Sequence, residues 1–276
     1  MKETAPAIAR LQAEHGLPPT GEADARVYAL LGIPYPNLFQ RCLGVTNAFE
    51  GTYYGDCNHT DMDNAGLTMG IIGFTSANGE VQCILREFWK RQPAMTTVFT
   101  DERRRHIESL LHTTLDPTAW GKFFFGPKCT LRYSKGLKVC PDILNAIALW
   151  GAEPEMRQLQ RDHAAQYWST VPAEVAELAL DSGTEAETNA AYAMLFDIHV
   201  QNGPLSTTHR TRFHRLCAKL PANAAMRDRL WNLAKVIAQC ATPRWRNDVL
   251  ARKSLFANGE GIVHGKRYSL AAQGLA

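Results

Sequence analysis

Hydrophobic residues recur at helical spacing along most of this chain, with polar and charged residues between them. The spacing predicts helices at 39–49, 81–91, 101–111, 142–150, 154–169, 173–180, 185–201, 207–219 and 224–239. Patterns typical of strands are confined to two short stretches, 52–54 and 68–72. We therefore expect a mainly α protein of the α+β class with a minor β element.

The first 33 residues make a section of their own. Apolar residues at helical spacing lie on either side of a breaker at 15–21, which contains two prolines and two glycines. This pattern predicts a helical hairpin. Pro34-Tyr35-Pro36-Asn37 follows as a predicted linker, so we expect a hairpin at 1–33 and one larger domain at 38–276.

Composition narrows the class of protein. Hydrophobic residues make up 45% and charged residues 21%, which is enough to bury a core and excludes global disorder. The formal charge of +3 is too small to predict a nucleic-acid partner. The sequence contains no apolar stretch of about 18 residues, so we expect no membrane span. No signal-peptide pattern follows Met1, so we expect synthesis in the cytoplasm.

The seven cysteines are widely spread and form no CxxC pair. This usage is typical of reduced thiols and does not suggest a zinc site. His59, Asp61 and Asp63 have only generic spacing for metal ligands, so we expect neither a metal nor a cofactor.

Two carboxylates flank a polar, glycine-rich loop near the centre of the sequence. Glu50 follows an apolar, helix-like stretch that ends in Phe49, and such surroundings favour the protonated carboxyl that a general acid needs. Asp63 lies 13 residues further on and is the candidate for the second, ionised carboxylate of a glycoside hydrolase. Asp56 and Asp61 in the same loop are alternatives to Asp63.

The segment Asp63-Asn64-Ala65-Gly66-Leu67-Thr68-Met69-Gly70-Ile71-Ile72-Gly73-Phe74 resembles a signature of the inverting chitosanases, glycoside hydrolase family forty-six of the lysozyme superfamily. That signature reads Asp-Gly-Arg-Gly-Tyr-Thr-x-Gly-Ile-Ile-Gly-Phe. Ala65 and Leu67 depart from it, since the family has an arginine and an aromatic residue there. The resemblance implies that Glu50 is the general acid, Asp63 the general base and Thr68 a residue that positions the attacking water. Glu80 stands where the family has an acidic substrate-binding residue.

Two weaker matches lie downstream. Residues 192–203 resemble the chitosanase helix that carries a buried Asp, and residues 246–252 resemble an Arg-x-Asp-x-x-x-Arg segment. In that family a buried arginine links the catalytic Glu to the helix Asp, so the resemblance implies those parts for Arg246 and Asp197. We group both with Tyr54 and Glu80 on the substrate-binding side of the site. Tyr54, like its neighbour Tyr53, either stacks on a sugar or packs beneath the loop.

Together the matches predict a lysozyme-like fold of two lobes, with a cleft between a helical lobe carrying Glu50 and a smaller lobe carrying Asp63. Residues 7–24 also resemble part of a three-helix peptidoglycan-binding module, through Leu11-Gln12, Gly16-Leu17 and Thr20-Gly21. This second resemblance favours peptidoglycan as the polymer, and so a bacteriolytic muramidase that cleaves its β-1,4 bonds; the alternative is a hairpin that only packs on the catalytic domain. The lack of a signal-peptide pattern is typical of phage endolysins released by a holin or of injected effectors, which act on the cell wall in the periplasm, and we expect a monomer. The alternatives are a chitosanase acting on chitosan and an inactive wall-binding protein.

Overall fold

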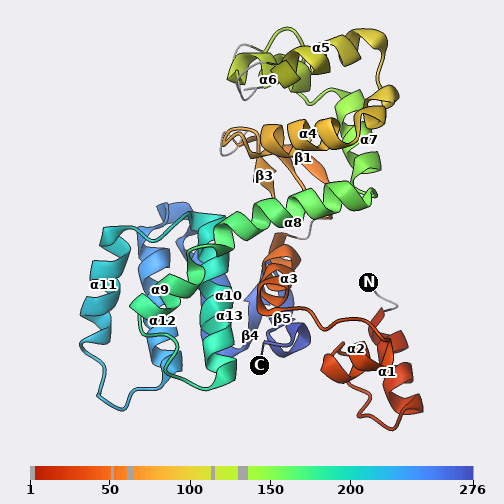
Figure 1. Ribbon diagram of the computed structural model, residues 1–276. Coiled ribbons are helices and arrows are strands. Elements are labelled where there is room, and N and C mark those ends of the chain that lie inside the picture. The colour runs from red at the N-terminus through yellow and green to blue at the C-terminus, as the bar shows by residue number, and fades with distance from the viewer. Residues whose placement is uncertain (1–3, 51–52, 61–64, 113–115, 130–135, 276) are drawn as a thin grey trace. The chain divides into compact units, whose positions relative to one another are not determined.

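The computed structural model describes residues 4–50, 53–60, 65–112, 116–129 and 136–275, without the side chains at 59 and 60. Over these ranges the chain is mainly helical with two small sheets, which confirms the predicted fold class (Figure 1). Contacts divide it into two compact units. The first contains residues 1–49 and 167–276, and the second contains residues 50–166.

The first unit is built around α10, Glu185–Asn202. This helix is apolar on every side over its central turns, and Ala193 through His199 are all buried. Thr184 and Glu187 form a reciprocal capping box that begins the helix. It packs against α9 (Val171–Glu177), α12 (Met226–Cys240) and α13 (Arg246–Asn258). The unit also contains α3 (Leu38–Glu50), α11 (Thr207–Cys217), η2 (Pro243–Trp245), a hairpin of β4 (Glu260–Val263) and β5 (Lys266–Ser269), and η3 (Ala271–Gln273).

The N-terminal section forms the predicted helical hairpin, α1 (Thr4–Glu14) and α2 (Ala25–Leu30). Buried Gln12 holds the turn between them. Its amide nitrogen donates to the Thr20 hydroxyl and the Glu22 carbonyl, each at 3.0 Å, and its oxygen accepts from the Gly21 amide at 2.9 Å. Asp24 caps α2.

The second unit contains an antiparallel sheet of β1 (Cys57–Thr60), β2 (Gly66–Met69) and β3 (Phe74–Thr75). Its helices are α4 (Glu80–Arg91), η1 (Pro93–Val98), α5 (Asp101–His112), α6 (Pro117–Phe125), α7 (Pro141–Trp150) and most of α8 (Pro154–Trp168). The indoles of Trp89 and Trp120 stack within 4° of parallel, and Trp150 meets Trp89 edge-on. This aromatic cluster is the core on which α4 rests.

The strand predicted at 52–54 is wrong, because residues 53 and 54 enter a turn and the first strand begins at Cys57. Asp56 makes the turn: its carboxylate accepts from the Tyr53 amide at 2.7 Å, and its own amide donates to the Tyr53 carbonyl at 3.0 Å. The strand predicted at 68–72 stops at Met69, where Gly70 adopts a φ of +77° and begins a turn.

Candidate active site

Glu50 is the last residue of α3, and the turn that precedes it is tightly packed within the first unit. The Phe49 ring meets Phe256 and Tyr268 edge-on, with centroid separations of 5.9 and 4.9 Å. The Tyr268 hydroxyl donates to the Ala48 carbonyl at 3.1 Å. Glu50 itself is half-buried. A carboxyl at the end of a well-packed helical turn has the support that a positioned acid needs.

A buried charge cluster adjoins this turn. Asp197 on α10 has no exposed surface. Its two carboxylate oxygens share the hydrogen of Arg252 Nε, and one of them also accepts from Arg252 Nη2 at 2.7 Å. Lys253 Nζ lies 2.5 Å from the same carboxylate, and the Thr46 hydroxyl donates to it at 3.0 Å. The Arg252 guanidinium also covers the Phe49 ring, 4.8 Å from its centre.

The electrostatics of this cluster favour an ionised Asp197. Burial alone would raise the pKa of Asp197, but the charges and hydrogen bonds of Arg252 and Lys253 outweigh it and lower that pKa to about 2. An enclosed carboxylate held by two cations is fixed in place and does not exchange protons near neutral pH.

Two expectations about this cluster are corrected. The arginine paired with Asp197 is Arg252, whereas Arg246 is exposed and donates to the Ala241 carbonyl at 3.3 Å. Arg246 begins α13, six residues before Arg252 and so about 9 Å away along the helix axis, outside the core. Asp197 is also fully enclosed, so it cannot contact a substrate and has a supporting position instead.

The sheet of the second unit brings Thr68 and Glu80 together. Thr68 on β2 is half-buried and lies on the face opposite to the buried Leu67 and Met69. Its partner across the sheet is Thr75 on β3. The Glu80 carboxylate accepts from the Thr75 amide at 2.9 Å and from the Thr75 hydroxyl at 3.3 Å. Glu80 is therefore fixed at the start of α4, beside the strand pair that carries Thr68.

Tyr54 packs against α8. Its hydroxyl accepts from Arg161 at 3.2 Å, and the guanidinium groups of Arg157 and Arg161 lie 5.6 and 5.8 Å from its ring centre. Of the two alternatives for Tyr54, this geometry favours packing beneath the loop. Tyr53 is 56% exposed and has the freer ring.

Gln160 on α8 was not singled out from the sequence, yet it joins the two segments on either side of the Asp63 loop. It is fully buried; its amide donates to the Tyr54 carbonyl at 2.8 Å, and its oxygen accepts from the Ile71 amide at 3.1 Å. In the sequence, Gln160 shows only as a polar residue at a helical position that faces inward. Its role becomes clear once the backbone groups that it bonds, at Tyr54 and Ile71, are known.

Of the candidate bases, Asp63 and Asp61 lie outside the described residues. Asp56 is described, and its carboxylate is engaged in the turn at Tyr53. In the chain order, the Asp63 loop connects β1 to β2 and so precedes the strand that carries Thr68.

A second buried polar cluster in the first unit also escaped notice in the sequence. His199 on α10 lies between the Glu174 carboxylate, 2.7 Å from Nε2, and the Tyr167 carbonyl, 3.1 Å from Nδ1. Arg210 binds the other oxygen of Glu174 at 2.7 Å. Although burial opposes it, the hydrogen bonds from His199 and Arg210 lower the pKa of Glu174. This cluster ties α9, α10 and α11 to the end of α8.

Within the described ranges, no group of three or more His, Cys, Asp or Glu side chains is placed to hold a metal ion. None of the helices in the described part of the chain has the length and apolar character that a membrane span needs.

Comparison with solved structures identifies the fold. The family forty-six chitosanase from Gynuella sunshinyii, in complex with chitotetraose, matches with a TM-score of 0.56 at 15% identity, over 86% of this chain and 99% of that one. The chain has the chitosanase fold. A glutamate-to-alanine variant of the chitosanase from Bacillus subtilis MY002, complexed with 6 GlcN, matches with a TM-score of 0.56 at 14% identity, over 86% of this chain and 100% of that one.

Chitosanase OU01, crystallised with substrate, gives a TM-score of 0.54 at 18% identity, over 90% of this chain and 98% of that one. The chitosanase fold thus extends over nearly the whole chain at low sequence identity. Comparisons with protein-family models and with curated proteins gave no match.

Proposed function

We propose that this protein is a glycoside hydrolase that cleaves β-1,4 bonds in a polymer containing glucosamine. The observation that carries the proposal is the position of Glu50, at the end of a tightly packed helix in a chain with the chitosanase fold. Glu50 is the proton donor to the leaving oxygen. Asp63 is the base that takes a proton from the attacking water, and Thr68 positions that water.

The buried cluster around Asp197 supports this assignment by stabilising the last turn of α3. Arg252 connects Asp197 to the Phe49 ring, and Thr46 connects Asp197 to the backbone turn that ends at Glu50. A general acid must be held within hydrogen-bonding reach of the glycosidic oxygen, and a small displacement is costly in rate. We assign Asp197, Arg252 and Thr46 to holding Glu50 in place.

Chitosan is the first substrate candidate. The solved structures with this fold are chitosanases, and two of them contain chitotetraose or 6 GlcN. The sequence-based expectation placed peptidoglycan first, but the structural neighbours favour the chitosan alternative. Peptidoglycan is the second candidate because of the hairpin α1–α2, whose Gln12, Thr20 and Gly21 belong to the segment that resembles a wall-binding module.

The test is to incubate the protein separately with chitosan and with purified peptidoglycan and to identify new reducing ends by mass spectrometry. We expect glucosamine oligomers from chitosan, and no release by a Glu50→Gln variant. Release from peptidoglycan alone would replace chitosan with the second candidate. Binding to either polymer without any cleavage would reject the hydrolase and favour a binding protein.

The stereochemistry is tested in the same reaction. Proton NMR of the first products distinguishes inversion, which gives the α-anomer, from retention, which gives the β-anomer. We expect the α-anomer, because Asp63 is assigned to activate water and not to attack the sugar.

A further inference from the structure

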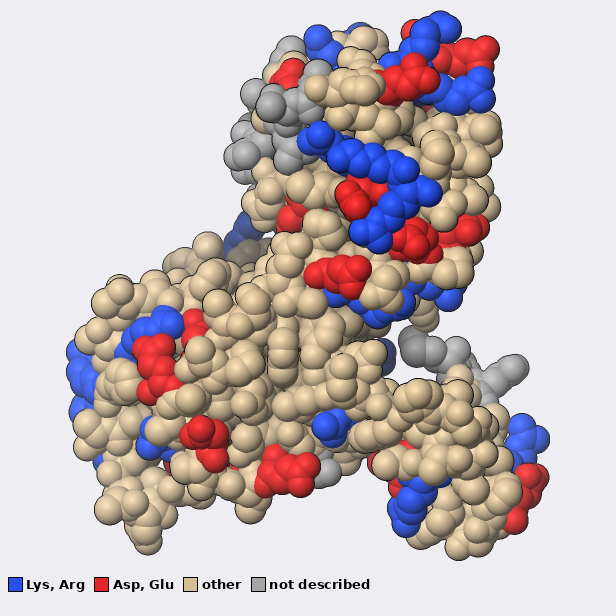
Figure 2. All heavy atoms as spheres, viewed as in Figure 1, with Lys and Arg blue, Asp and Glu red and all other residues tan. Residues whose placement is uncertain are grey.

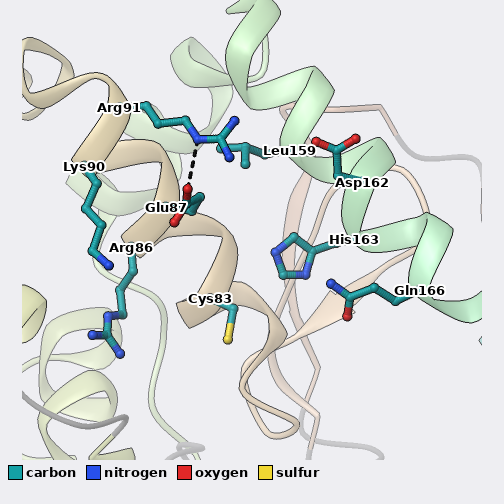
Figure 3. A pocket seen from close by; sticks show the side chains of 9 residues that line it. All are labelled: Cys83, Arg86, Glu87, Lys90, Arg91, Leu159, Asp162, His163 and Gln166. Atoms are coloured by element: carbon teal, nitrogen blue, oxygen red, sulfur yellow. Dashed lines mark hydrogen bonds and ion pairs between the residues drawn. The ribbon is translucent and has the colours of Figure 1, made fainter.

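A groove of about 400 Å³ lies between α4 and α8 in the second unit, apart from the residues assigned to catalysis. Its size is within the range of about 300–1,000 Å³ that small-molecule sites occupy. Its lining on the α4 side is Cys83, Arg86, Glu87, Lys90 and Arg91, and on the α8 side it is Leu159, Asp162, His163 and Gln166 (Figure 3).

His163 is the central polar group of this groove. Its ring packs edge-on against Phe74, with a centroid separation of 6.3 Å, and points toward α4 (Figure 3). Among the described residues, neither ring nitrogen has a hydrogen-bond partner. Burial lowers the pKa of His163, so near neutral pH the ring is uncharged and offers one donor and one acceptor. That pairing suits a sugar hydroxyl.

The charges that act on His163 are negative. Glu80, Asp162 and Glu87 each exert an attractive electrostatic effect on its protonated form. Asp162 is exposed, and one of its oxygens accepts from Gln158 at 2.7 Å while the other has no partner among the described residues. This end of the groove therefore favours a ligand that brings a positive charge.

Three basic side chains also line the groove, all of them on the α4 side. Arg91 is already paired with Glu87 at 2.9 Å and with Glu155 at 2.7 Å. Arg86 and Lys90 extend from the side of α4 away from His163, and Arg86 donates to the Leu111 carbonyl (Figure 3). Basic and acidic side chains are interspersed over this part of the surface (Figure 2).

We propose that the groove between α4 and α8 binds a protonated glucosamine unit of the polymer, outside the site of bond cleavage. Asp162 accepts a hydrogen bond from the ammonium group, and His163 and Gln166 bind the hydroxyls. The apolar side chain of Leu159 forms part of the floor. The identity of the ligand rests on the proposed function, whereas the groove and its charge do not.

Cys83 provides a reporter that is built into the native chain, because it is a free thiol that lines the groove. The experiment measures the rate at which iodoacetamide alkylates Cys83, by peptide mass spectrometry, with increasing concentrations of a glucosamine hexamer. Cys240, an exposed thiol on α12 in the first unit, is the internal control. The protein is used with Glu50→Gln to prevent turnover, and again as the native chain at short times.

We expect the hexamer to slow alkylation of Cys83 at least fivefold and to leave Cys240 unchanged. Asp162→Asn should raise the concentration needed for half-protection by about five- to tenfold, because a charge-assisted hydrogen bond is lost. Asp181→Asn, which changes an exposed acid in the first unit, is the matched control and should have no effect.

The outcomes separate this proposal from the proposed function. Hydrolysis of chitosan without protection of Cys83 would reject glucosamine binding in the groove but would still support the proposed hydrolase activity. Protection without hydrolysis would support the groove and reject the enzyme. Equal protection by an N-acetylglucosamine hexamer, which has no ammonium group, would overturn the role of Asp162, as would an unchanged response in Asp162→Asn.

Discussion

The Thr46 hydroxyl donates a hydrogen bond to the Asp197 carboxylate at 3.0 Å, although 151 residues separate the two in sequence. Thr46 lies four residues before Glu50 on α3, and residues with that spacing share one face of a helix. The bond therefore joins the charge cluster inside the first unit to the helix that presents the candidate acid. We expect the cluster to position Glu50 as well as to stabilise the fold, and both effects can be tested.

Thr46→Val keeps the shape of the side chain and removes its hydroxyl. Because the variant leaves one hydrogen bond of a buried carboxylate unmade, we expect the free energy of unfolding to fall by about 1–3 kcal/mol. We also expect kcat on chitosan to fall about tenfold with little change in KM, since Glu50 would be less well placed. Urea unfolding and steady-state kinetics measure both quantities. Thr46→Ser should restore kcat, and a serine variant as impaired as valine would contradict positioning by the hydroxyl.

Protonation of Asp197 at low pH should lower the free energy of unfolding by a predictable amount. The pKa of this carboxyl is about 2 in the folded chain and 3.8 as its ordinary value, so ionised Asp197 stabilises the fold above the ordinary value. That contribution is lost as the pH falls from about 4 toward 2, and the two values correspond to a contribution on the order of 2 kcal/mol. Urea unfolding at a series of pH values measures the slope.

Asp197→Asn should flatten this slope between pH 4 and 2 and lower stability at pH 7 by about 3–5 kcal/mol, because it leaves Arg252 and Lys253 buried without their carboxylate. Asp181→Asn is the control for an exposed acid. If the Asp197 variant does not fold, Thr46→Val should still shift the acid midpoint upward. An unaltered slope in both variants would contradict the low pKa of Asp197.

Variants of the carboxylates test the catalytic assignment. Glu50→Gln should reduce turnover of chitosan by at least about 100-fold, since general acid catalysis contributes on that order. Asp63→Asn should have a comparable effect, whereas Asp56→Asn should mainly affect folding because Asp56 holds the turn at Tyr53. Asp61→Asn is the matched control from the same loop. A larger loss of kcat in Asp61→Asn than in Asp63→Asn would move the base to position 61.

The sequence predicts amphipathic elements well and others poorly. The helices α3 and α4 were expected within one residue of their observed bounds, because one face of each is apolar at regular spacing. By contrast, α6 has Trp120 and Phe123–Phe125 buried around most of its circumference, which leaves no polar face to detect. The hairpin β4–β5 is largely exposed and polar, so it shows no alternation.

The candidate site shows the same division. The position of Glu50 at the end of a helix follows from the apolar run before it. The sequence does not show whether Arg246 or Arg252 pairs with Asp197. That depends on which part of α13 is buried, and packing against α10 and α12 decides it. Lys253, fully buried beside Asp197, was missed for the same reason.

Thiol reactivity provides a test of the packing beside the candidate site. Burial raises the pKa of Cys57 on β1 to about 12 and raises that of Cys42 on α3 as well. At pH 8 the thiolate fraction of Cys57 is therefore about 10³-fold below that of an ordinary cysteine. With iodoacetamide under native conditions, exposed Cys240 should react first, and Cys42 and Cys57 should react only after unfolding in urea. Fast alkylation of Cys57 in the native protein would show that β1 is accessible.

The last prediction concerns Gly70, which begins the turn after β2 with a φ of +77°. A Cβ there would come within 2.2 Å of the Gln160 side-chain oxygen, the atom that accepts from the Ile71 amide. Gly70→Ala should therefore cost both the strain of a positive φ, about 1–2 kcal/mol, and the displacement of Gln160. We expect a total loss of about 3–4 kcal/mol in urea unfolding.

Gly136→Ala separates the two terms, because Gly136 lies in the same unit with a φ of +74° and nothing within 4 Å of an added Cβ. It should show the strain alone. Gln160→Ala removes the clash, so in the Gly70→Ala background it should cost less than it does in the native chain. Strict additivity of these two substitutions would mean that Gln160 does not hold the turn, and that the segment following β2 and the Tyr54 segment are positioned by other contacts.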